Sequence, residues 1–404
     1  MQPTLNLRSR SPSQPDWSGR PVAALAMCLL PSLGLPGEAV AQSNFRLRPS
    51  LELIGGWDDN LLSTPQPAEK DWMGRVTPGL EATVTGPRSV FGLRYGAEAE
   101  GFADHPELAA APAAQNAEAW LDFDGSRWSS ETRGSYAETN RPWELNVATG
   151  LAAGRIEGRR TEAHQVLGHR FGPRTKAIAD YNYRLEELTG DVRGDIHVGR
   201  LGLERRFSPR DVVSYSYALR RFAFKPGGEA LSSGGEGAPV TTHVLTIGWE
   251  RALSPGTVLK LEAGPRFGDG GVHPEGAASL RHTSDRGEMS LGYSQTQTTI
   301  LGESDVAVTD EVGASLSHRL VSRLTIYLAP GWFWTRVGDR EARVWRTDAE
   351  LRWQVTPYLL IAGAHALTYE TGDLGRAEGG EVIRNLFMLR LRIIPAPSVR
   401  RASK

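Results

Sequence analysis

The sequence predicts an all-β protein, a single transmembrane antiparallel up-and-down β-barrel of about 18 strands within a range of 16 to 20. Three observations point to this fold class. Apolar and polar residues alternate with period 2 nearly everywhere after residue 44. Short turns of similar text recur between the alternating runs, and longer loops rich in Gly, Asp, Glu and Pro lie between them. The N-terminus has the composition of an export signal.

The N-terminal segment is typical of a secretory signal peptide over residues 1–41. Arg8, Arg10 and Arg20 form a basic region, an apolar stretch follows from Val22 to Leu35, and Ala39-Val40-Ala41 forms a cleavage site. The single cysteine, Cys28, lies inside this segment. A lipoprotein signal ending at Cys28 is the weaker alternative, because Met27 is large for the position before a lipidated cysteine. Cleavage after residue 41 leaves a chain without thiols, which excludes disulfides and thiolate metal sites.

Composition narrows the classes that remain. The chain is 40% hydrophobic and carries a net charge of −1, so neither a helical membrane protein nor a nucleic-acid partner is expected. No run after the signal approaches the roughly 20 apolar residues of a membrane-spanning helix. A barrel in an outer membrane instead predicts a lipid bilayer and the barrel-assembly machinery as partners.

Each strand is predicted from its own alternating run. Phe91, Leu93 and Tyr95, for example, alternate with Gly92 and Arg94. The predicted strands are 45–57, 71–85, 89–102, 115–123, 128–138, 160–171, 175–186, 191–207, 211–224, 241–253, 257–266, 276–282, 287–297, 305–318, 324–337, 342–355, 359–370 and 382–393. The strand at 276–282 has the weakest pattern.

Strand length and aromatic placement favour a membrane barrel over a soluble sandwich, which would show the same alternation. Many runs span more residues than the usual strand of about 5–6 and fit a tilted crossing of about 9–11. Tryptophans gather near strand ends, as interfacial girdles require: Trp57, Trp72, Trp128, Trp249, Trp332 and Trp334.

An even strand count places both termini of the chain on one side of the membrane, and the mature N-terminus in the periplasm then sets the orientation of the barrel. The short turns, which include Gly86–Ser89, Gly172–Thr175, Ser208–Asp211 and Ser254–Thr257, are then periplasmic, and Pro presets φ in each. The outward connections are 58–70, 103–114, 139–159, 187–190, 225–240, 267–275, 298–304, 338–341 and 371–381. The barrel is expected over 42–394, with a short periplasmic tail over 395–404.

A search for catalytic or metal chemistry finds little. No nucleophile elbow, zinc motif or phosphate loop is present, and His164 and His169 fall on opposite faces of one strand. Neither an enzyme nor a cofactor is therefore expected. Asp58, Asp59 and Asn60 are the one compact set of oxygen ligands that calcium could use, but the same residue types commonly start turns, and we favour the turn.

The polar strand faces are the best candidates for a functional surface, because they line the lumen of a membrane barrel. Arginines and carboxylates occur there in similar number, which suits a hydrated, nearly neutral passage. Arg–carboxylate ladders that stiffen the barrel are an equally good explanation for any one pair. The lumen candidates are Arg46, Arg48, Arg75, Arg94, Glu98, Glu100, Glu131, Arg133, Asp180, Arg184, Arg200, Glu204, Arg220, Glu250, Glu262, Glu288, Arg346, Asp348, Glu350, Arg352, Arg384, Arg390 and Arg392.

Residues 45–80 resemble a known family. Pro49-Ser50-Leu51-Glu52-Leu53, Trp57-Asp58-Asp59-Asn60-Leu61 and Pro78-Gly79-Leu80 are similar to the opening of the outer-membrane barrels encoded beside exopolysaccharide and capsule genes. The resemblance implies an 18-stranded portal through which a polysaccharide chain leaves, working with a periplasmic polysaccharide-export protein. The chain departs from many outer-membrane proteins in lacking a terminal aromatic residue, since it continues for eleven residues past Ile393.

Two functions therefore stand as hypotheses. The first is an outer-membrane channel for export of a secreted polysaccharide through a polar lumen. The alternative is a general or small-solute porin, in which a long loop folded inward would narrow the passage; residues 139–159 and 225–240 are the candidate loops. A barrel enzyme or adhesin is the least supported interpretation.

Overall fold

The computed structural model describes residues 44–65, 68–151, 154–189, 192–225, 238–268, 271–374, 380–395 and 398–401. The predicted signal peptide, residues 1–41, lies outside the described residues and stays a prediction. So does most of the 225–240 loop. Among the described residues no helix is long and apolar enough to cross a membrane.

Nearly all of the described chain is β-strand, with two short 3₁₀ helices at Pro106–Leu108 and Pro142–Glu144. The strands are β1 Asn44–Asp58, β2 Asp71–Thr85, β3 Ser89–Phe102, β4 Ala110–Asp124, β5 Trp128–Thr139, β6 Gly158–Arg170, β7 Thr175–Leu188, β8 Arg193–Arg206, β9 Asp211–Lys225, β10 Val240–Ser254, β11 Thr257–Gly268, β12 Gly271–Ser284, β13 Gly287–Thr299, β14 Val306–Val321, β15 Leu324–Val337, β16 Arg340–Thr356, β17 Leu359–Gly372, β18 Gly380–Ile393 and β19 Ser398–Arg401.

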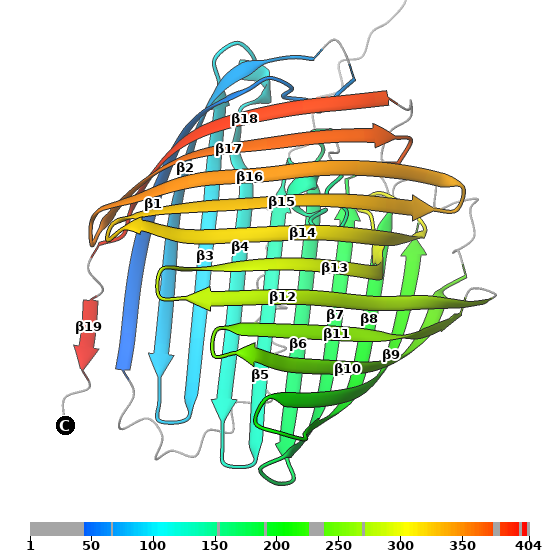
Figure 1. The fold of residues 1–404 in the computed structure, drawn as a ribbon. Helices are drawn as coiled ribbons and strands as arrows, with labels where there is room; N and C mark the ends of the chain where they lie inside the picture. The colour runs from blue at the N-terminus through cyan, green and yellow to red at the C-terminus, as the bar shows by residue number, and fades with distance from the viewer. Residues whose placement is uncertain are drawn as a thin grey trace, which may run out of the picture. The chain divides into compact units, whose positions relative to one another are not determined.

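The strands form one closed antiparallel barrel (Figure 1). From β1 to β18 each strand pairs with the next, and β18 pairs with β1 over Leu51↔Ile393 to Asp58↔Leu386, which closes the ring. The prediction of 18 barrel strands is confirmed. The tail adds something the sequence did not predict, because β19 continues along the free edge of β1, pairing with Asn44–Leu47.

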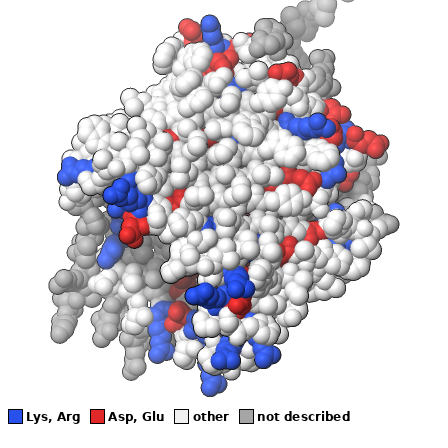
Figure 2. All heavy atoms as spheres, in the orientation of Figure 1, with Lys and Arg blue, Asp and Glu red and all other residues white. Residues whose placement is uncertain are grey.

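Side-chain alternation gives the barrel an apolar outside and a polar inside. On β2, Trp72, Val76 and Leu80 point outward and are 64%, 44% and 47% exposed, whereas Met73 and Arg75 point inward and are buried. The outer face of β10–β18 is largely free of charge in its middle, with charged side chains gathered toward the strand ends (Figure 2). A closed ring that exposes a continuous apolar belt fits a bilayer, and the protein is an outer-membrane barrel.

The connections divide the barrel into a short-turn rim and a long-loop rim. The eight short turns span two to four residues, at 86–88, 125–127, 171–174, 207–210, 255–256, 285–286, 322–323 and 357–358. The connections at the other rim are 59–70, 103–109, 140–157, 189–192, 226–239, 269–270, 300–305, 338–339 and 373–379.

One predicted long loop is wrong. Residues 267–275 are almost entirely strand, because β11 runs to Gly268 and β12 begins at Gly271. The local sequence Gly268-Asp269-Gly270-Gly271, followed by Pro274, has the composition of a turn, which hid the start of β12. In the barrel Pro265 and Pro274 lie opposite each other, so neither strand uses an N–H at that rung.

Candidate functional site

The polar face predicted from the sequence faces the lumen, and its exposure changes with depth. On β3 the side chain of Arg94 is 53% exposed, that of Glu98 is 13% exposed and that of Glu100 is fully buried. On β18 the exposure falls from Arg390 to Arg384 in the same direction, toward the long-loop rim. The lumen is therefore open toward the short turns and filled toward the long loops.

The predicted lumen candidates occupy inward strand positions: Arg46, Arg48, Arg75, Arg94, Glu98, Glu131, Arg133, Asp180, Arg184, Arg200, Glu204, Arg220, Arg346, Asp348, Glu350, Arg352, Arg384 and Arg390. Four predicted candidates need a correction as solute contacts. Glu100, Arg75, Arg220 and Arg384 are buried in ion pairs, because loops and cross-lumen side chains cover them.

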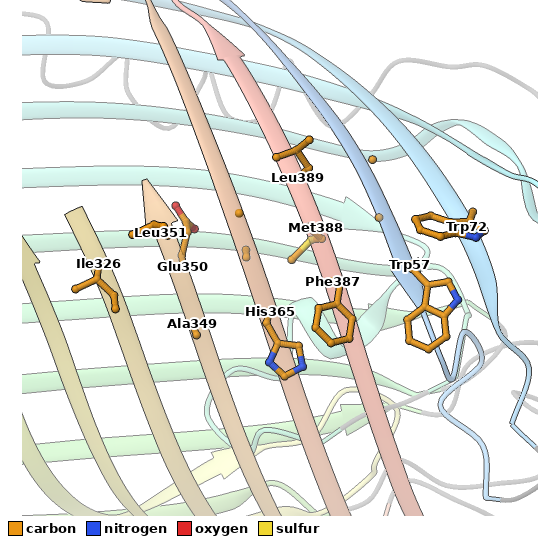
Figure 3. A pocket seen from close by; sticks show the side chains of 14 residues that line it. Trp57, Trp72, Ile326, Ala349, Glu350, Leu351, His365, Phe387, Met388 and Leu389 are labelled. Atoms are coloured by element: carbon orange, nitrogen blue, oxygen red, sulfur yellow. The ribbon is translucent and has the colours of Figure 1, made fainter. Parts of the chain in front are cut away.

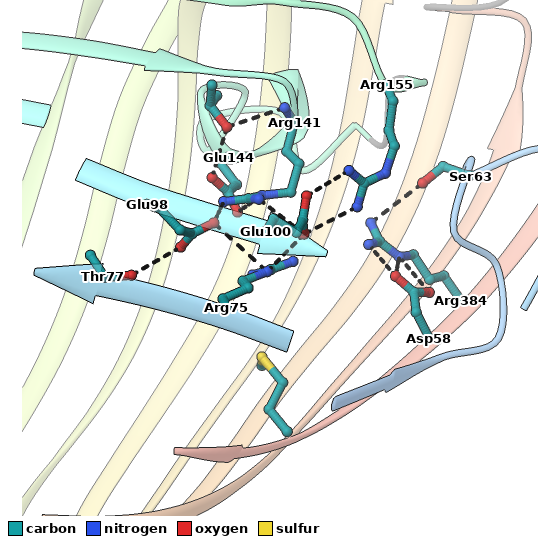
Figure 4. Close-up of polar contacts among 12 residues, drawn as sticks. Asp58, Ser63, Arg75, Thr77, Glu98, Glu100, Arg141, Glu144, Arg155 and Arg384 are labelled. Atoms are coloured by element: carbon teal, nitrogen blue, oxygen red, sulfur yellow. Dashed lines mark hydrogen bonds and ion pairs between the residues drawn. The ribbon is translucent and has the colours of Figure 1, made fainter. Parts of the chain in front are cut away.

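The filling on one side of the barrel comes from the connection between β5 and β6, residues 140–157, which we call the inward loop. Arg141 places its guanidinium 2.6 Å from Glu98 and 3.1 Å from Glu100 of β3 (Figure 4). Arg155, from the far end of the loop, lies 2.8 Å from the other oxygen of Glu100. Arg75 of β2 contacts the same carboxylate at 2.8 Å. Three arginines thus converge on one fully buried glutamate.

Charge pairing offsets the effect of burial on Arg141. Burial alone would lower the pKa of Arg141, but the carboxylates of Glu144, Glu100 and Glu98 raise it above the ordinary arginine value. Glu144 lies 2.7 Å from the Nε atom of Arg141 within the inward loop. Arg141 is therefore balanced by one carboxylate of the inward loop, Glu144, and by two carboxylates of the barrel wall, Glu98 and Glu100.

The indole of Trp143 connects the charged cluster to the seam of the barrel, which is the place where β18 pairs with β1 and closes the ring. The guanidinium of Arg384, on β18, lies 4.3 Å from the Trp143 ring centroid, and that of Arg155 lies 5.9 Å from it. Arg384 is fixed by Asp58 of β1, with Nη2 2.6 Å and Nε 3.1 Å from the carboxylate oxygens. The inward loop therefore contacts β3 through Arg141 and β18 through Trp143.

The C-terminal half of the inward loop packs into an apolar cluster on another part of the wall. Leu151 is buried with Phe333 of β15 and Val344 of β16. Gly150 has φ +67°, and a side chain there would meet the Phe333 ring at 2.8 Å, so glycine suits both the backbone and the close approach. Asn146 accepts a hydrogen bond from the Leu301 N–H at 3.1 Å. The inward loop thus reaches β2–β3, β18 and β14–β16.

Cross-lumen side chains fill the other side of the long-loop half. Arg220 of β9 makes a two-point contact with Glu275 of β12, with N–O distances of 2.8 and 2.6 Å. Glu186 of β7 is bound by Arg160 and also accepts a hydrogen bond at 2.6 Å from the Thr299 hydroxyl of β13. The Arg220–Glu275 and Thr299–Glu186 contacts join strands that are not neighbours, so they narrow the barrel near the long-loop rim.

Within the described residues, the wider part of the lumen includes two cavities. One, of about 800 Å³, lies under the inward loop, with Glu144 and Val147 on its loop side and Tyr327, Arg346 and Asp348 on its wall. The second, of about 310 Å³, is lined by β7–β11 and carries Asp180, Arg200, Glu204, Glu250, Lys260 and Glu262. Both signs of charge are present, as the sequence predicts.

The Asp58-Asp59-Asn60 segment forms a hydrogen-bonded turn, which is the interpretation we favour from the sequence. Asp58 is occupied by Arg384, and Asp59 accepts hydrogen bonds from the backbone N–H and the side-chain amide of Asn385 at 2.6 and 2.7 Å. Asn60 accepts a hydrogen bond from the Thr64 N–H. No group of three or more His, Cys, Asp or Glu placed to hold a metal occurs within the described ranges.

Sequence reasoning missed the residues of the inward loop that make the constriction: Arg141, Trp143, Glu144, Asn146, Leu151 and Arg155. It did select residues 139–159 as a loop that would narrow the passage if folded inward. The amino-acid sequence of the loop contains a stronger indication that it folds inward, because Trp143, Leu145 and Leu151 are unusual in a connection exposed to water.

No protein-family model matches the sequence, and no curated protein matches it significantly. Among solved structures the chain is similar to OccAB4 of Acinetobacter baumannii, with a TM-score of 0.48 and 8% identity over 88% of this chain and 99% of that one. It is also similar to OccK2 (OpdF) of Pseudomonas aeruginosa, with a TM-score of 0.45 and 12% identity over 86% and 98%. The siderophore receptor PirA of Pseudomonas aeruginosa gives 0.41 and 9% over 86% and 80%.

Proposed function

We propose that this barrel is an outer-membrane channel for small solutes and that the inward loop sets its size limit. One observation carries the proposal: Arg141, Trp143 and Leu151 of the inward loop contact β3, β18 and β15–β16 respectively, on separate parts of the lumen wall. A loop anchored on three parts of the wall would limit passage to small molecules and exclude a wide polymer. The wide, mixed-charge lumen on the short-turn side would then act as a vestibule.

Polysaccharide export is the second candidate function. It rests on the resemblance of residues 45–80, and on their place at the seam, where Asp58 positions Arg384 beneath Trp143. For a polymer to pass, the inward loop would have to leave the lumen. That movement would separate Glu100 from two of its three arginines and expose the apolar cluster around Leu151. Under this alternative a periplasmic polysaccharide-export protein would supply the interaction that displaces the loop.

The experiment that separates the two functions compares the intact barrel with a variant in which residues 141–157 are replaced by a short Gly-Ser linker. Each protein is placed in liposomes, and swelling is followed with a monosaccharide and with a long oligosaccharide. Replacing residues 104–108 in the same way gives a matched control, because the 3₁₀ helix of that loop contains no buried residue.

We expect the intact barrel and the control to admit the monosaccharide slowly and to exclude the oligosaccharide, whereas loop replacement admits both. If the intact barrel admits the oligosaccharide as fast as the loop-replaced variant, the small-solute proposal is wrong. That outcome would favour an open passage and the export function.

A further inference from the structure

The short-turn rim carries arginine at one repeated position. The last residue of each short turn accepts, through its carbonyl oxygen, a backbone N–H from the end of the neighbouring strand. The eight residues at this position are Arg88, Arg127, Arg174, Arg210, Gly256, Arg286, Arg323 and Tyr358. Six of them are exposed arginines, which we call the arginine ring. Pro presets φ in a tight turn, but nothing in the turn itself requires arginine at this position.

The arginine ring lies on the lumen-facing side of the strands that it precedes. Side chains an even number of residues apart share a face of a strand. Arg88 is six residues before Arg94 of the lumen wall, and Arg174 is six residues before Asp180. The outward position beside a turn holds an apolar residue instead, such as Phe171, which is 68% exposed. The arginine ring therefore surrounds the mouth of the lumen at the short-turn rim, which the predicted orientation places in the periplasm.

Most of the arginine ring has no counter-charge. Within the described residues, the side chain forms no ion pair or hydrogen bond in four of the six: Arg88, Arg127, Arg174 and Arg286. Arg323 donates to the carbonyl oxygen of Val355 at 3.1 Å, which is an uncharged partner. Asp124 donates its backbone N–H to the carbonyl oxygen of Arg88, but its carboxylate lies 3.2 Å from Arg170. These exposed guanidiniums are therefore available to a partner outside the chain.

Several members of the arginine ring face a second arginine on the neighbouring strand. Arg206 donates its backbone N–H to the carbonyl oxygen of Arg174 at 2.8 Å. Arg319 makes the same contact with Arg286 at 2.6 Å. Like charges directly opposite each other destabilise a sheet, and a bound anion removes this cost. Figure 2 shows basic side chains gathered along its lower edge, where several short turns lie in Figure 1.

The long-loop rim shows the opposite arrangement. There Arg193 lies 3.4 Å from Glu187, and Arg340 lies 2.6 Å from Glu303. An arginine-rich composition alone would leave the two rims alike. The lack of counter-charges at the arginine ring is therefore specific to the short-turn rim of the described chain.

The spacing of the arginine ring favours a partner with several carboxylates. Successive short turns are two strands apart, which is about 10 Å along the rim at the usual strand spacing. A small anion therefore reaches one ring position at a time, whereas a surface with many carboxylates reaches several at once. The planar guanidinium binds a carboxylate through two parallel hydrogen bonds, which suits arginine to this role.

A membrane lipid fits the arginine ring less well than a protein in the periplasm does. The lipid-facing groove at the seam, about 850 Å³ in volume, is lined by residues that include Trp57, Phe387 and Leu389 (Figure 3). No arginine is among the described residues that line it. Because the arginine ring faces the mouth of the lumen, a lipid on the outside of the barrel does not bring its head group to the ring.

We propose that the arginine ring docks a periplasmic protein through an acidic face that covers the short-turn mouth of the lumen. Carboxylates of the partner bind four consecutive turns, at Arg88, Arg127, Arg174 and Arg210. Charges at the rim are screened beyond about 8 Å at physiological ionic strength, so they act on a partner in contact with the rim rather than on small ions within the lumen. The inward loop lies in the other half of the barrel, so this docking does not depend on the size limit proposed for the channel.

The test measures the binding of fluorescent probes to the detergent-solubilised barrel by fluorescence anisotropy. A poly-L-glutamate peptide represents the acidic face of a protein, and an oligogalacturonate of equal charge represents an acidic polysaccharide. Inorganic phosphate, added as a competitor, represents a small anion.

Two variants that lose the same net charge are compared with the intact barrel. The ring variant carries Arg88→Gln, Arg127→Gln, Arg174→Gln and Arg210→Gln. The control variant changes four exposed arginines near the long-loop rim and carries Arg159→Gln, Arg193→Gln, Arg340→Gln and Arg343→Gln. Circular dichroism checks that each variant is folded.

We expect the intact barrel and the control variant to bind poly-L-glutamate with the same affinity, and oligogalacturonate more weakly. The ring variant should bind the peptide about a hundredfold more weakly, since four charge-assisted contacts are lost. Peptide binding to the intact barrel should also weaken as salt is added, because salt screens exposed charges.

Equal affinity of the ring and control variants for the peptide would overturn the proposal, because net charge alone would then explain the binding. Oligogalacturonate binding as tightly as the peptide would assign the ring to an acidic polysaccharide. Displacement of the peptide by an equal concentration of inorganic phosphate would reduce the ring to a small-anion site. Either of these last two results would overturn the docking of a protein.

Discussion

Glu100 is the residue on which the constriction depends most. Its carboxylate is fully buried and contacts Arg75, Arg141 and Arg155. Two of these arginines come from the inward loop and one from the wall, so the same carboxylate joins loop to barrel. A buried ion pair is a weak source of net stability, but removing one partner leaves buried charge uncompensated.

The first prediction concerns Glu100→Gln. The substitution leaves three buried guanidiniums with one fewer carboxylate, a change that costs about 3–5 kcal/mol in comparable buried pairs. We expect the inward loop to detach and single-channel conductance in a planar bilayer to rise. Glu131→Gln is the matched control: Glu131 faces the open lumen beside Arg133 and is 47% exposed, so its pair contributes at most about 1 kcal/mol. Equal conductance for the two variants would contradict this role of Glu100.

The second prediction concerns His105, in the connection 103–109. The buried carboxylate of Asp71 lies 2.9 Å from Nδ1 of His105, and this hydrogen bond raises the pKa of His105 above 6.5. Protonated His105 is the form that the folded state prefers. The contact therefore stabilises the loop fully below the unfolded pKa of about 6.5 and is lost as pH rises through the higher folded value.

The measurement is a proton NMR titration of the His105 ring in detergent micelles. We expect a midpoint above 6.5 in the intact protein and a lower one in Asp71→Asn. A midpoint at or below 6.5 in the intact protein would show that the Asp71 contact is not formed.

At the scale of elements, the strands were predictable because period-2 alternation is a local property of the chain. In the run from Phe91 to Ala99, the alternation alone shows which side chains share a face, and the neighbouring strand need not be known. The start of β12 was missed because Pro274 and the glycines at 268, 270 and 271 have turn-forming chemistry, and only pairing with β11 holds β12 extended. The existence of each strand could therefore be predicted from the sequence, whereas the long loop predicted at 267–275 is a hairpin between β11 and β12.

The inward loop was only partly predictable, for a physical reason. Its anchors join residues distant in sequence, such as Arg141 with Glu98 of β3 and Leu151 with Phe333 of β15. No local pattern states which wall a loop will contact. Length and apolar content could indicate that residues 139–159 fold inward, but the residues that hold the loop there appear only once the barrel is closed.

The third prediction locks the inward loop in place. The Asn146 side chain accepts a hydrogen bond from the backbone N–H of Leu301 at 3.1 Å, so these two positions are the contact at which we test a cross-link. The chain has one natural cysteine, Cys28, inside the predicted signal peptide, so Asn146→Cys with Leu301→Cys can be oxidised without competing thiols. We expect low conductance in the oxidised state and higher conductance after reduction, because the double variant lacks the Asn146 hydrogen bond.

Single-channel recording before and after a reductant checks this, with the Asn146→Cys single variant as control. A conductance that does not change on reduction of the double variant would mean that the loop is not a moving restriction at this contact.

At the scale of the whole molecule, the lumen combines a constriction at the long-loop half with a mixed-charge vestibule on the short-turn side. Arg346 pairs with Asp348 at 3.0 Å, and Arg94 with Glu81 at 2.9 Å, so exposed charges of the wall largely compensate one another. Such a wall should discriminate little between small cations and anions.

The fourth prediction follows from this balance. In a planar bilayer with a tenfold gradient of potassium chloride, we expect a reversal potential close to zero for the intact barrel. Replacing Glu81, Asp348 and Glu350 with glutamine should shift it toward anion selectivity, because Arg94, Arg346 and Arg390 each lose one carboxylate partner. A strong selectivity in the intact protein would show that one sign dominates the pathway.

The most direct test of the size-limited channel is polymer exclusion on single barrels in a planar bilayer. Neutral polyethylene glycols of increasing mass are added, and the smallest that leaves the conductance unchanged marks the size limit. For the intact barrel we predict exclusion already at small polymers, and a clear shift to larger ones when residues 141–157 are replaced by a short linker. The same limit in both proteins would contradict the account, because the inward loop would then not determine what passes through the barrel.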